Sequence, residues 1–170
     1  MKSSGIKTST VLASFLLAAC LSMHAEVKLP AIFSDGMVMQ QQTNANLWGT
    51  ATPNKKVTVT TGWNGKQYAV TADKNGSWKL SVSTPEAGGP YTITFDDGTQ
   101  KTLNNILIGE LWLCSGQSNM EWTMRNNTDG EELLKHVNNP DIRLFNVNRD
   151  SSFYPQTALN GDVTVSYTHL

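Results

Sequence analysis

Two serines that lie close together in the chain, Ser115 and Ser118, are the side chains best suited to nucleophilic chemistry. They belong to the run Ser-Gly-Gln-Ser-Asn-Met at 115–120, which follows an apolar stretch. A serine on a tight turn can be approached by substrate, and backbone N–H groups of that turn can stabilise an oxyanion. The run has neither the Gly-x-Ser-x-Gly of a nucleophile elbow nor the Gly-Lys-Ser/Thr of a phosphate loop. From these residues alone, a nucleophile and a serine-rich helix start both stay open.

A serine nucleophile needs a base, and the three histidines of the chain offer little choice. His24 lies in the N-terminal leader and His169 in the last six residues. His136 lies near the end of a predicted helix, where a solvated cation suits the helix dipole. We therefore expect the chain by itself to lack the base that the serine requires.

Two further residues near the serines are expected to be structural. Cys114 is predicted to be a small buried apolar residue rather than a reactive thiol. Glu121, three residues after Ser118, is predicted to complement the N-terminus of a helix rather than to act as a catalytic acid. No His, Cys and Asp cluster has the spacing of metal ligands, so no metal or cofactor is expected.

The sequence around the serines predicts a strand–helix–strand (βαβ) unit. Residues 106–114 form a near-continuous apolar run, which is typical of a strand that is covered on both faces in a parallel sheet. Residues 129–137 have acids early and basic residues late, which predicts a helix, and residues 142–147 predict a second strand. Ligands bind at the carboxyl ends of strands in such folds, where the serines would lie.

Residues 26–105 predict an all-β sandwich. The pairs Asn-Gly at 64–65 and 75–76 and Asp-Gly at 97–98 are typical of tight hairpin turns. Between them apolar residues alternate with polar ones, as in strands with one buried face, and residues 85–90 predict a loop. Trp48 and Trp63 are expected to pack in the core or at an edge, with stacking on sugar rings as the alternative.

Charge and composition exclude several classes of protein. The chain has 170 residues, with 13 Lys and Arg against 14 Asp and Glu, so its net charge is −1. It therefore lacks the basic face of a nucleic-acid binder or of a polybasic membrane-surface protein. With 39% hydrophobic and 16% charged residues it is expected to fold. Two cysteines make no disulfide framework.

Both ends of the sequence are expected to lie outside the folded part. Residues 1–25 are predicted to be a secretory signal peptide, because their apolar stretch is too short to span a membrane. Cleavage after Ala25 competes with a lipobox that would lipidate Cys20. Either way the protein is expected to be exported, to the periplasm, the outer surface or the medium. Residues 165–170 match one reading frame of a sequencing adapter, which predicts an N-terminal piece of a longer protein.

Several blocks of the sequence resemble one family of hydrolases. Residues 110–122, Glu-Leu-Trp-Leu-Cys-Ser-Gly-Gln-Ser-Asn-Met-Glu-Trp, are similar to the nucleophile block of the sialate O-acetylesterases, which belong to the SGNH hydrolase superfamily. Residues 28–40, 88–94 and 139–145 resemble further blocks of the same proteins. The resemblance as a whole extends over nearly everything from about 26 to 160. The lipobox-like leader is typical of a bacterial protein.

The resemblance implies a domain layout and a catalytic residue. Residues 26–105 would be a β-sandwich domain, and 106–164 the truncated start of an α/β, flavodoxin-like SGNH domain. Ser118 would attack an acetyl ester on a sialic acid, and its backbone N–H would form part of the oxyanion hole. The catalytic Asp and His, and the other oxyanion donors, would come from later blocks that this sequence does not contain. No cofactor is implied.

Two alternative functions stay open from the sequence. The first is an esterase that acts on other acetylated glycans, such as xylan. The second is a carbohydrate-binding β-sandwich module without catalytic activity. No nucleic acid and no membrane span is expected, and a lipid anchor at Cys20 is the one membrane contact that the sequence leaves open.

Overall fold

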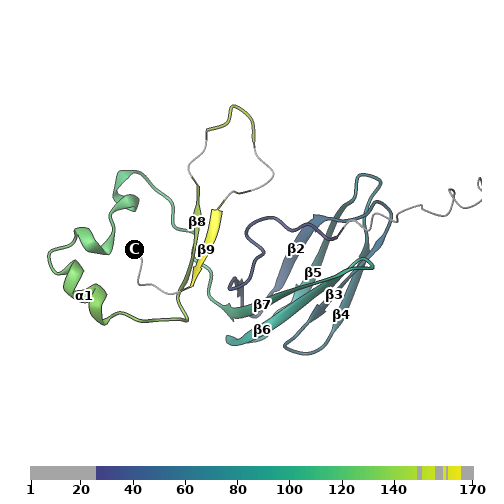
Figure 1. The fold of residues 1–170 in the computed structure, drawn as a ribbon, viewed down its shortest axis with the longest axis horizontal. Coiled ribbons are helices and arrows are strands. Elements are labelled where there is room, and N and C mark those ends of the chain that lie inside the picture. The colour runs from purple at the N-terminus through teal and green to yellow at the C-terminus, as the bar shows by residue number, and fades with distance from the viewer. Residues whose placement is uncertain (1–25, 149–150, 156–158, 160, 166–170) are drawn as a thin grey trace, which may run out of the picture.

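The computed structural model describes residues 26–148, 151–155, 159 and 161–165, and these residues form mainly strands (Figure 1). The strands that the sequence predicts for residues 26–105 are thus confirmed, whereas the layout of a sandwich followed by an α/β domain stays a prediction. The elements follow in the order β1 (Val38–Gln40), β2 (Asn44–Thr50), β3 (Lys56–Thr61), β4 (Gln67–Thr71), β5 (Ser77–Ser83), β6 (Gly88–Asp96), β7 (Gln100–Gly109), the 3-10 helices η1 (Ser118–Glu121) and η2 (Met124–Asn126), α1 (Gly130–His136), β8 (Arg143–Val147) and β9 (Gly161–Val165).

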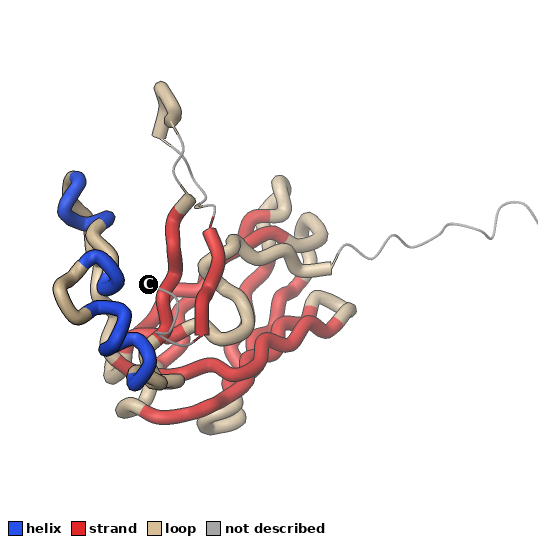
Figure 2. Tube along the Cα trace, turned by 60° about the vertical axis from the view of Figure 1, so that its left-hand side comes forward, coloured by secondary structure: helices blue, strands red, loops and turns tan. Residues whose placement is uncertain are grey.

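The strands form three sheets. The largest has the order β1-β7-β6-β3-β4, in which β1 runs parallel to β7 with Val38 opposite Leu107. Strands β2 and β5 form a separate antiparallel pair, and β8 pairs with β9. Figure 2 shows that the helical segments gather beside the β8–β9 pair, away from the larger group of strands. The chain therefore has a β-rich part that ends with β7 and a second, smaller part that follows it.

The predicted strands and tight turns are present where the alternation and the Asn-Gly and Asp-Gly pairs indicate them. The turns at 64–65 and 97–98 close the hairpins β3–β4 and β6–β7, whereas the turn at 75–76 connects β4 to β5 in another sheet. In β3, Val57 and Val59 are buried, whereas Thr58 and Thr60, which alternate with them, are half-buried. Gly65, Gly76 and Gly98 have φ angles of +67°, +83° and +112°, which glycine adopts without strain. At Gly76 a Cβ atom would also lie 2.4 Å from the carbonyl oxygen of Ala51, so only glycine fits this turn.

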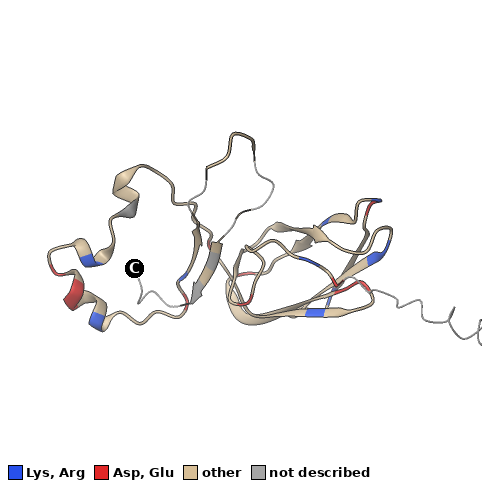
Figure 3. Cartoon of the chain, turned by 45° about the horizontal axis from the view of Figure 1, so that its top comes forward, with Lys and Arg blue, Asp and Glu red and all other residues tan. Residues whose placement is uncertain are grey.

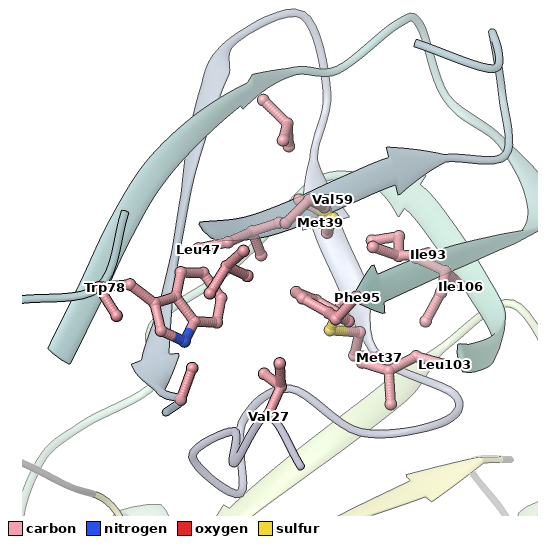
Figure 4. Close-up of a cluster of buried hydrophobic side chains, with 14 of the residues drawn as sticks. Val27, Met37, Met39, Leu47, Val59, Trp78, Ile93, Phe95, Leu103 and Ile106 are labelled. Carbon is pink, nitrogen blue, oxygen red and sulfur yellow. The ribbon is translucent and has the colours of Figure 1, made fainter. Parts of the chain in front are cut away.

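One apolar core is shared by side chains of the five-stranded sheet and of the β2–β5 pair (Figure 4). Leu47 and Trp78 come from the β2–β5 pair, and Phe95, Ile93 and Ile106 come from the larger sheet. The rings of Trp78 and Phe95 lie 5.9 Å apart. Because the two sheets bury their apolar faces against the same side chains, the β-rich part is stabilised chiefly by this core.

Two sequence predictions about this part are wrong in detail. Residues 85–90 were expected to form a loop, but β6 already begins at Gly88, and Gly88 pairs with Ile108. Residues 106–114 were expected to form one buried strand. Instead 106–109 are the end of β7, and 110–117 have no regular secondary structure. A continuous apolar pattern does not reveal which strands lie beside it. Here the neighbouring strand β1 pairs with this segment only as far as Gly109.

The smaller part has the predicted helix and strand but not the predicted connection between them. Helix α1 and strand β8 lie within one residue of where the sequence indicates them. However, β8 pairs antiparallel with β9 rather than parallel with a strand before the serines. Within the described ranges there is thus no βαβ unit. The domain boundary at 105 stays a prediction, and β7 runs across it.

The two predicted terminal segments lie outside the described residues, apart from Val165, which ends β9. This applies to the signal peptide with Cys20 and to residues 166–170. Among the residues that the structure does describe, no helix has the length and apolar character that a membrane crossing requires.

The core predicts a large effect of truncating Phe95, whose side chain is fully buried. We expect Phe95→Ala to lower the free energy of unfolding by ~3–5 kcal/mol, because it removes apolar contacts and leaves a cavity. Urea denaturation followed by tryptophan fluorescence measures this loss. The exposed Lys56 on β3 provides the control, and Lys56→Ala should change stability by less than ~0.5 kcal/mol. Equal effects of the two substitutions would contradict the packing described here.

Candidate active site

The segment that carries the serines leaves the five-stranded sheet at Glu110, directly after β7. The side-chain amides of Gln40 and Gln41 donate hydrogen bonds to the two carboxylate oxygens of Glu110, at 3.1 and 2.6 Å. The backbone N–H of Leu111 donates to Oε1 of Gln40 at 2.9 Å. These three bonds, called the Glu110 contact below, fix the first two residues of the segment to the end of β1.

The Glu110 contact is also electrostatic. The hydrogen bonds from Gln41, and to a lesser extent from Gln40, hold the pKa of Glu110 below its ordinary value because they favour the charged carboxylate. A carboxyl group whose pKa is lower in the folded than in the unfolded chain stabilises the folded state. The full contribution is present at any pH above the pKa that the group has in the unfolded chain. This contribution is lost as the pH falls through the folded pKa. The contact is therefore intact at neutral pH and weakens in acid.

Beyond the Glu110 contact the segment is exposed. The exposed fractions of Leu111, Trp112 and Leu113 are 56, 84 and 96%. Cys114 is exposed too, so the prediction that it is buried is wrong. That prediction assumed a strand covered on both faces, but residues 110–117 pair with no strand among the described residues. Exposed apolar runs of this kind are typical of surfaces that contact another protein surface, a ligand or a membrane.

Ser118 begins the single 3-10 turn η1, and both it and Ser115 are exposed. Gln117, just before η1, is extended, and its carbonyl oxygen accepts a hydrogen bond from the N–H of Met120 at 2.9 Å. A Cβ atom on Gly116 would lie 2.5 Å from Cγ of Met120, so glycine lets Met120 fold back over the turn. The first N–H groups of a helical turn have no partner within the turn, which leaves that of Ser118 able to face a ligand.

The structure does not place Glu121 at the start of a helix, so the prediction that it complements a helix N-terminus is wrong. Glu121 is the last residue of η1, and α1 begins only at Gly130. A Cβ atom on Gly130 would lie 1.9 Å from the carbonyl oxygen of Met124, so η2 packs directly on the start of α1. The residues after Ser118 thus form short separate helical turns rather than one helix that the serine caps.

His136 pairs within its own helix. Its Nε2 lies 3.2 Å from a carboxylate oxygen of Glu132, whose other oxygen accepts a hydrogen bond from Lys135 at 2.6 Å. The contact with Lys135, and then that with His136, lowers the pKa of Glu132. Acidic and basic residues accordingly follow each other along the ribbon of α1 (Figure 3). His136 is exposed, which confirms the expectation of a solvated residue at the helix end.

A second contact, which the sequence gave no sign of, joins β8 to the larger sheet. The guanidinium group of Arg143 donates hydrogen bonds to the carbonyl oxygen of Gly36 at 2.8 Å, to the carbonyl oxygen of Asn105 and to Oδ1 of Asn105 at 2.8 Å. The backbone of Asn105, which provides both of these oxygens, has a φ of +57°, a conformation that asparagine tolerates. Partial burial lowers the pKa of Arg143. The residues that bracket the serine segment are therefore both tied to the β-rich part.

The two tryptophans differ in their surroundings. Trp63 packs against the core, lies 5.9 Å from the Tyr91 ring and donates from Nε1 to the carbonyl oxygen of Ser83 at 3.1 Å. The packing prediction is therefore confirmed for Trp63. Trp48, on β2, is 38% exposed and lies on the outer side of its sheet.

Comparison with known proteins gives a consistent set of relatives. No family model matches the chain. It is 33% identical to sialate O-acetylesterase of Mus musculus over 146 residues, which are 78% of this chain and 27% of that protein. It is 31% identical to sialate O-acetylesterase of Homo sapiens over 107 residues, 57% of this chain and 20% of that protein. The chain thus spans 20 to 27% of the length of these curated relatives.

A solved structure agrees with the sequence relatives. A carbohydrate acetylesterase from Xanthomonas citri superimposes with a TM-score of 0.78 and 33% sequence identity. The similarity covers 82% of this chain and 32% of that one. A match over 82% of this chain must include residues on both sides of Gly109. The similarity therefore extends beyond the β-rich part into the segment that carries the serines. The resemblance seen in the sequence blocks is confirmed.

The Glu110 contact predicts the titration of this carboxyl group. In the chain as it stands, we expect the Glu110 carboxyl carbon to titrate below the ordinary glutamate value in a pH series followed by NMR. Gln41→Ala should move the pKa of Glu110 upward, because it removes the hydrogen bond with the largest effect. Gln42→Asn is the matched control, since the Gln42 amide contacts Glu86 instead. A Glu110 pKa that Gln41→Ala leaves unchanged would contradict the geometry.

Proposed function

Because the chain is related to the sialate O-acetylesterases over most of its length, we propose that its full-length protein is a serine esterase that removes acetyl groups from carbohydrates. The observation that carries the proposal is the position of Ser118. It is an exposed serine at the head of a 3-10 turn, within the block that resembles the nucleophile block of that family. The homologous mouse and human proteins bear the esterase name, and the similar Xanthomonas citri structure is a carbohydrate acetylesterase.

The proposed reaction proceeds through an acyl-serine. Oγ of Ser118 attacks the acetyl carbonyl carbon and gives up its proton to a base, and the sugar hydroxyl leaves with a proton. Water then hydrolyses the acetyl-serine, which releases acetate and restores the hydroxyl group of Ser118. The negative charge that develops on the carbonyl oxygen would be stabilised in part by the backbone N–H of Ser118. This scheme needs no metal and no cofactor.

The base of the proposed reaction lies beyond this chain. His136 is the one histidine among the described residues, and it pairs with Glu132 in its own helix. The family resemblance implies an Asp-x-x-His block in a later part of the protein. Since the chain spans at most 27% of the curated relatives, such a block has ample room in a full-length protein. An orienting carboxylate would accompany the histidine.

We propose O-acetylated sialic acid as the substrate, with other acetylated glycans such as xylan as the alternative. The names of the mouse and human relatives support the sialate substrate, and that of the Xanthomonas citri structure supports carbohydrate acetyl esters in general. Release of acetate from 9-O-acetylated sialic acid and from acetylated xylan distinguishes them. A higher kcat/KM on the sialic acid supports the sialate proposal, and the reverse contradicts it.

The proposed organisation follows the family. Residues 26–105 would be a β-sandwich domain, and 106–164 would start an SGNH hydrolase domain of α/β type. The shared core of the two sheets supports the first assignment. The exposed apolar run at 111–113 supports the second, because such a run becomes buried when further strands lie beside it. We also propose that residues 1–25 direct export, so that the protein is periplasmic, bound to the outer surface or secreted.

The role of Ser118 predicts a large loss of activity on one substitution. In the full-length protein, Ser118→Ala should lower kcat on 4-nitrophenyl acetate by about 10⁴-fold or more, because the attacking oxygen is gone. Ser115→Ala is the matched control, since it removes an equally exposed hydroxyl three residues earlier and should retain activity within about threefold. The melting temperature of both variants should equal that of the parent. Full activity in Ser118→Ala would overturn the proposed function.

The chain of 170 residues alone is expected to be inactive. A serine without a positioned base is a weak nucleophile. Its hydrolysis of 4-nitrophenyl acetate should therefore equal that of its own Ser118→Ala variant. Turnover that depends on Ser118 in this chain would show that a base is present within it.

A further inference from the structure

We propose that the outer face of the β2–β5 pair binds a pyranose ring that carries a carboxylate group. The face consists of three tiers of exposed side chains with Trp48 in the middle, and we call it the Trp48 face. Its members are Lys28, Asn46, Trp48, Thr50, Ser77, Lys79 and Ser81. This inference is independent of the proposed esterase activity, because no residue of the face lies in the segment that carries Ser118.

The register of the two strands places these side chains on one surface. Asn46 lies opposite Ser81, Trp48 opposite Lys79 and Thr50 opposite Ser77. Side chains two residues apart on a strand point to the same face, and directly opposed residues lie about 5 Å apart. The intervening residues Leu47, Trp78 and Val82 point the other way and are buried in the core. The Trp48 face is therefore the solvent side of the sheet.

Trp48 is held in a fixed orientation although part of its ring is exposed. The ring of Phe33 lies 4.6 Å from it at an angle of 75°, in an edge-to-face arrangement. Phe33 in turn packs against the core. An aromatic ring that is fixed in advance loses little conformational entropy on binding. Its flat apolar surface fits the C–H face of a pyranose ring, which the sugar hydroxyls leave exposed.

Hydrogen-bonding groups flank the ring on one side. The hydroxyl group of Ser81 donates to Oδ1 of Asn46 at 2.7 Å, which orients the amide of Asn46 so that its NH₂ group points away from Ser81. This tier lies next to Trp48 along both strands. Amide and hydroxyl groups beside a flat ring match the alternating donors and acceptors of sugar hydroxyls.

Positive charge selects an anionic sugar over a neutral one. Lys79 lies opposite Trp48, and Lys28 lies opposite Thr50 in the next tier through a pair of backbone hydrogen bonds. Both lysines are exposed, and no acidic residue occurs in the three tiers. The two carboxylates nearest along the chain have other partners. Glu26 accepts a hydrogen bond from Lys101 at 3.2 Å, and Asp73 accepts hydrogen bonds from the backbone N–H groups of Asn75 and Ser77. The face thus complements a carboxylate on the bound ring.

Two classes of anionic pyranose share this chemistry, the sialic acids and the uronic acids. The experiment uses the 170-residue chain and three probes, namely 3′-sialyllactose, lactose and digalacturonic acid. Binding is followed by ligand-observed saturation-transfer NMR and by titration of backbone amide shifts. We expect at least one acidic probe to bind with at least tenfold higher affinity than lactose, and to shift amide signals of β2 and β5. Which acidic probe binds more tightly identifies the source of the carboxylate.

Variants test whether the Trp48 face is the site. Trp48→Ala and Lys79→Ala should each lower the affinity for the acidic probe at least tenfold, while Trp48→Phe, which keeps a flat ring, should lose less. Lys56→Ala removes an exposed lysine from β3 and should have no effect. If Trp48→Ala does not fold, Lys79→Ala and Trp48→Phe still decide the question.

Several results would overturn the inference. Absence of saturable binding by both acidic probes would do so, as would equal affinity for lactose. Retention of affinity in Lys79→Ala would also contradict it. None of these results bears on Ser118, since the activity of the Ser118→Ala variant is measured separately in the full-length protein.

Discussion

The hydrogen bonds between Glu110 and the two glutamines at the end of β1 determine where the serine segment leaves the sheet. Both carboxylate oxygens of Glu110 are used, and the next backbone N–H is used as well. Eight residues later the chain reaches Ser118, without regular secondary structure over 110–117. The direction in which the segment starts is therefore set by β1, a strand of only three residues that is held by its parallel pairing with β7.

This arrangement assigns different tasks to the two parts of the chain. The β-rich part has a closed apolar core and supplies fixed points, namely the amides of Gln40 and Gln41 and the oxygens of Gly36 and Asn105. The second part meets them through Glu110 before the serines and Arg143 after them. Functional residues are commonly carried by irregular segments on a rigid scaffold, and precise positioning requires supporting contacts around them. The proposed nucleophile lies between two such contacts.

Sequence reasoning located the local elements but not the long-range ones. Strand alternation in β3 to β6 and the turns at Gly65 and Gly76 follow from interactions between near neighbours, so they could be predicted. The exposure of Cys114 and the irregular backbone at 110–114 could not be predicted, because an apolar run indicates a tendency to be covered and not which strand covers it. The contacts of Glu110 and Arg143 join residues 38 to 107 positions apart. A single sequence carries no sign of such pairings, and the role of Ser118 stays a prediction that rests on the family resemblance.

The central claim is that Ser118 is the group that attacks the ester, and covalent labelling tests it most directly. The full-length protein would be treated with a fluorophosphonate, which reacts with activated serines, and the modified peptide would be sequenced by mass spectrometry. We predict one modified residue, Ser118, and loss of esterase activity in proportion to the label. Modification of a different serine, with activity lost in the same proportion, would contradict the assignment.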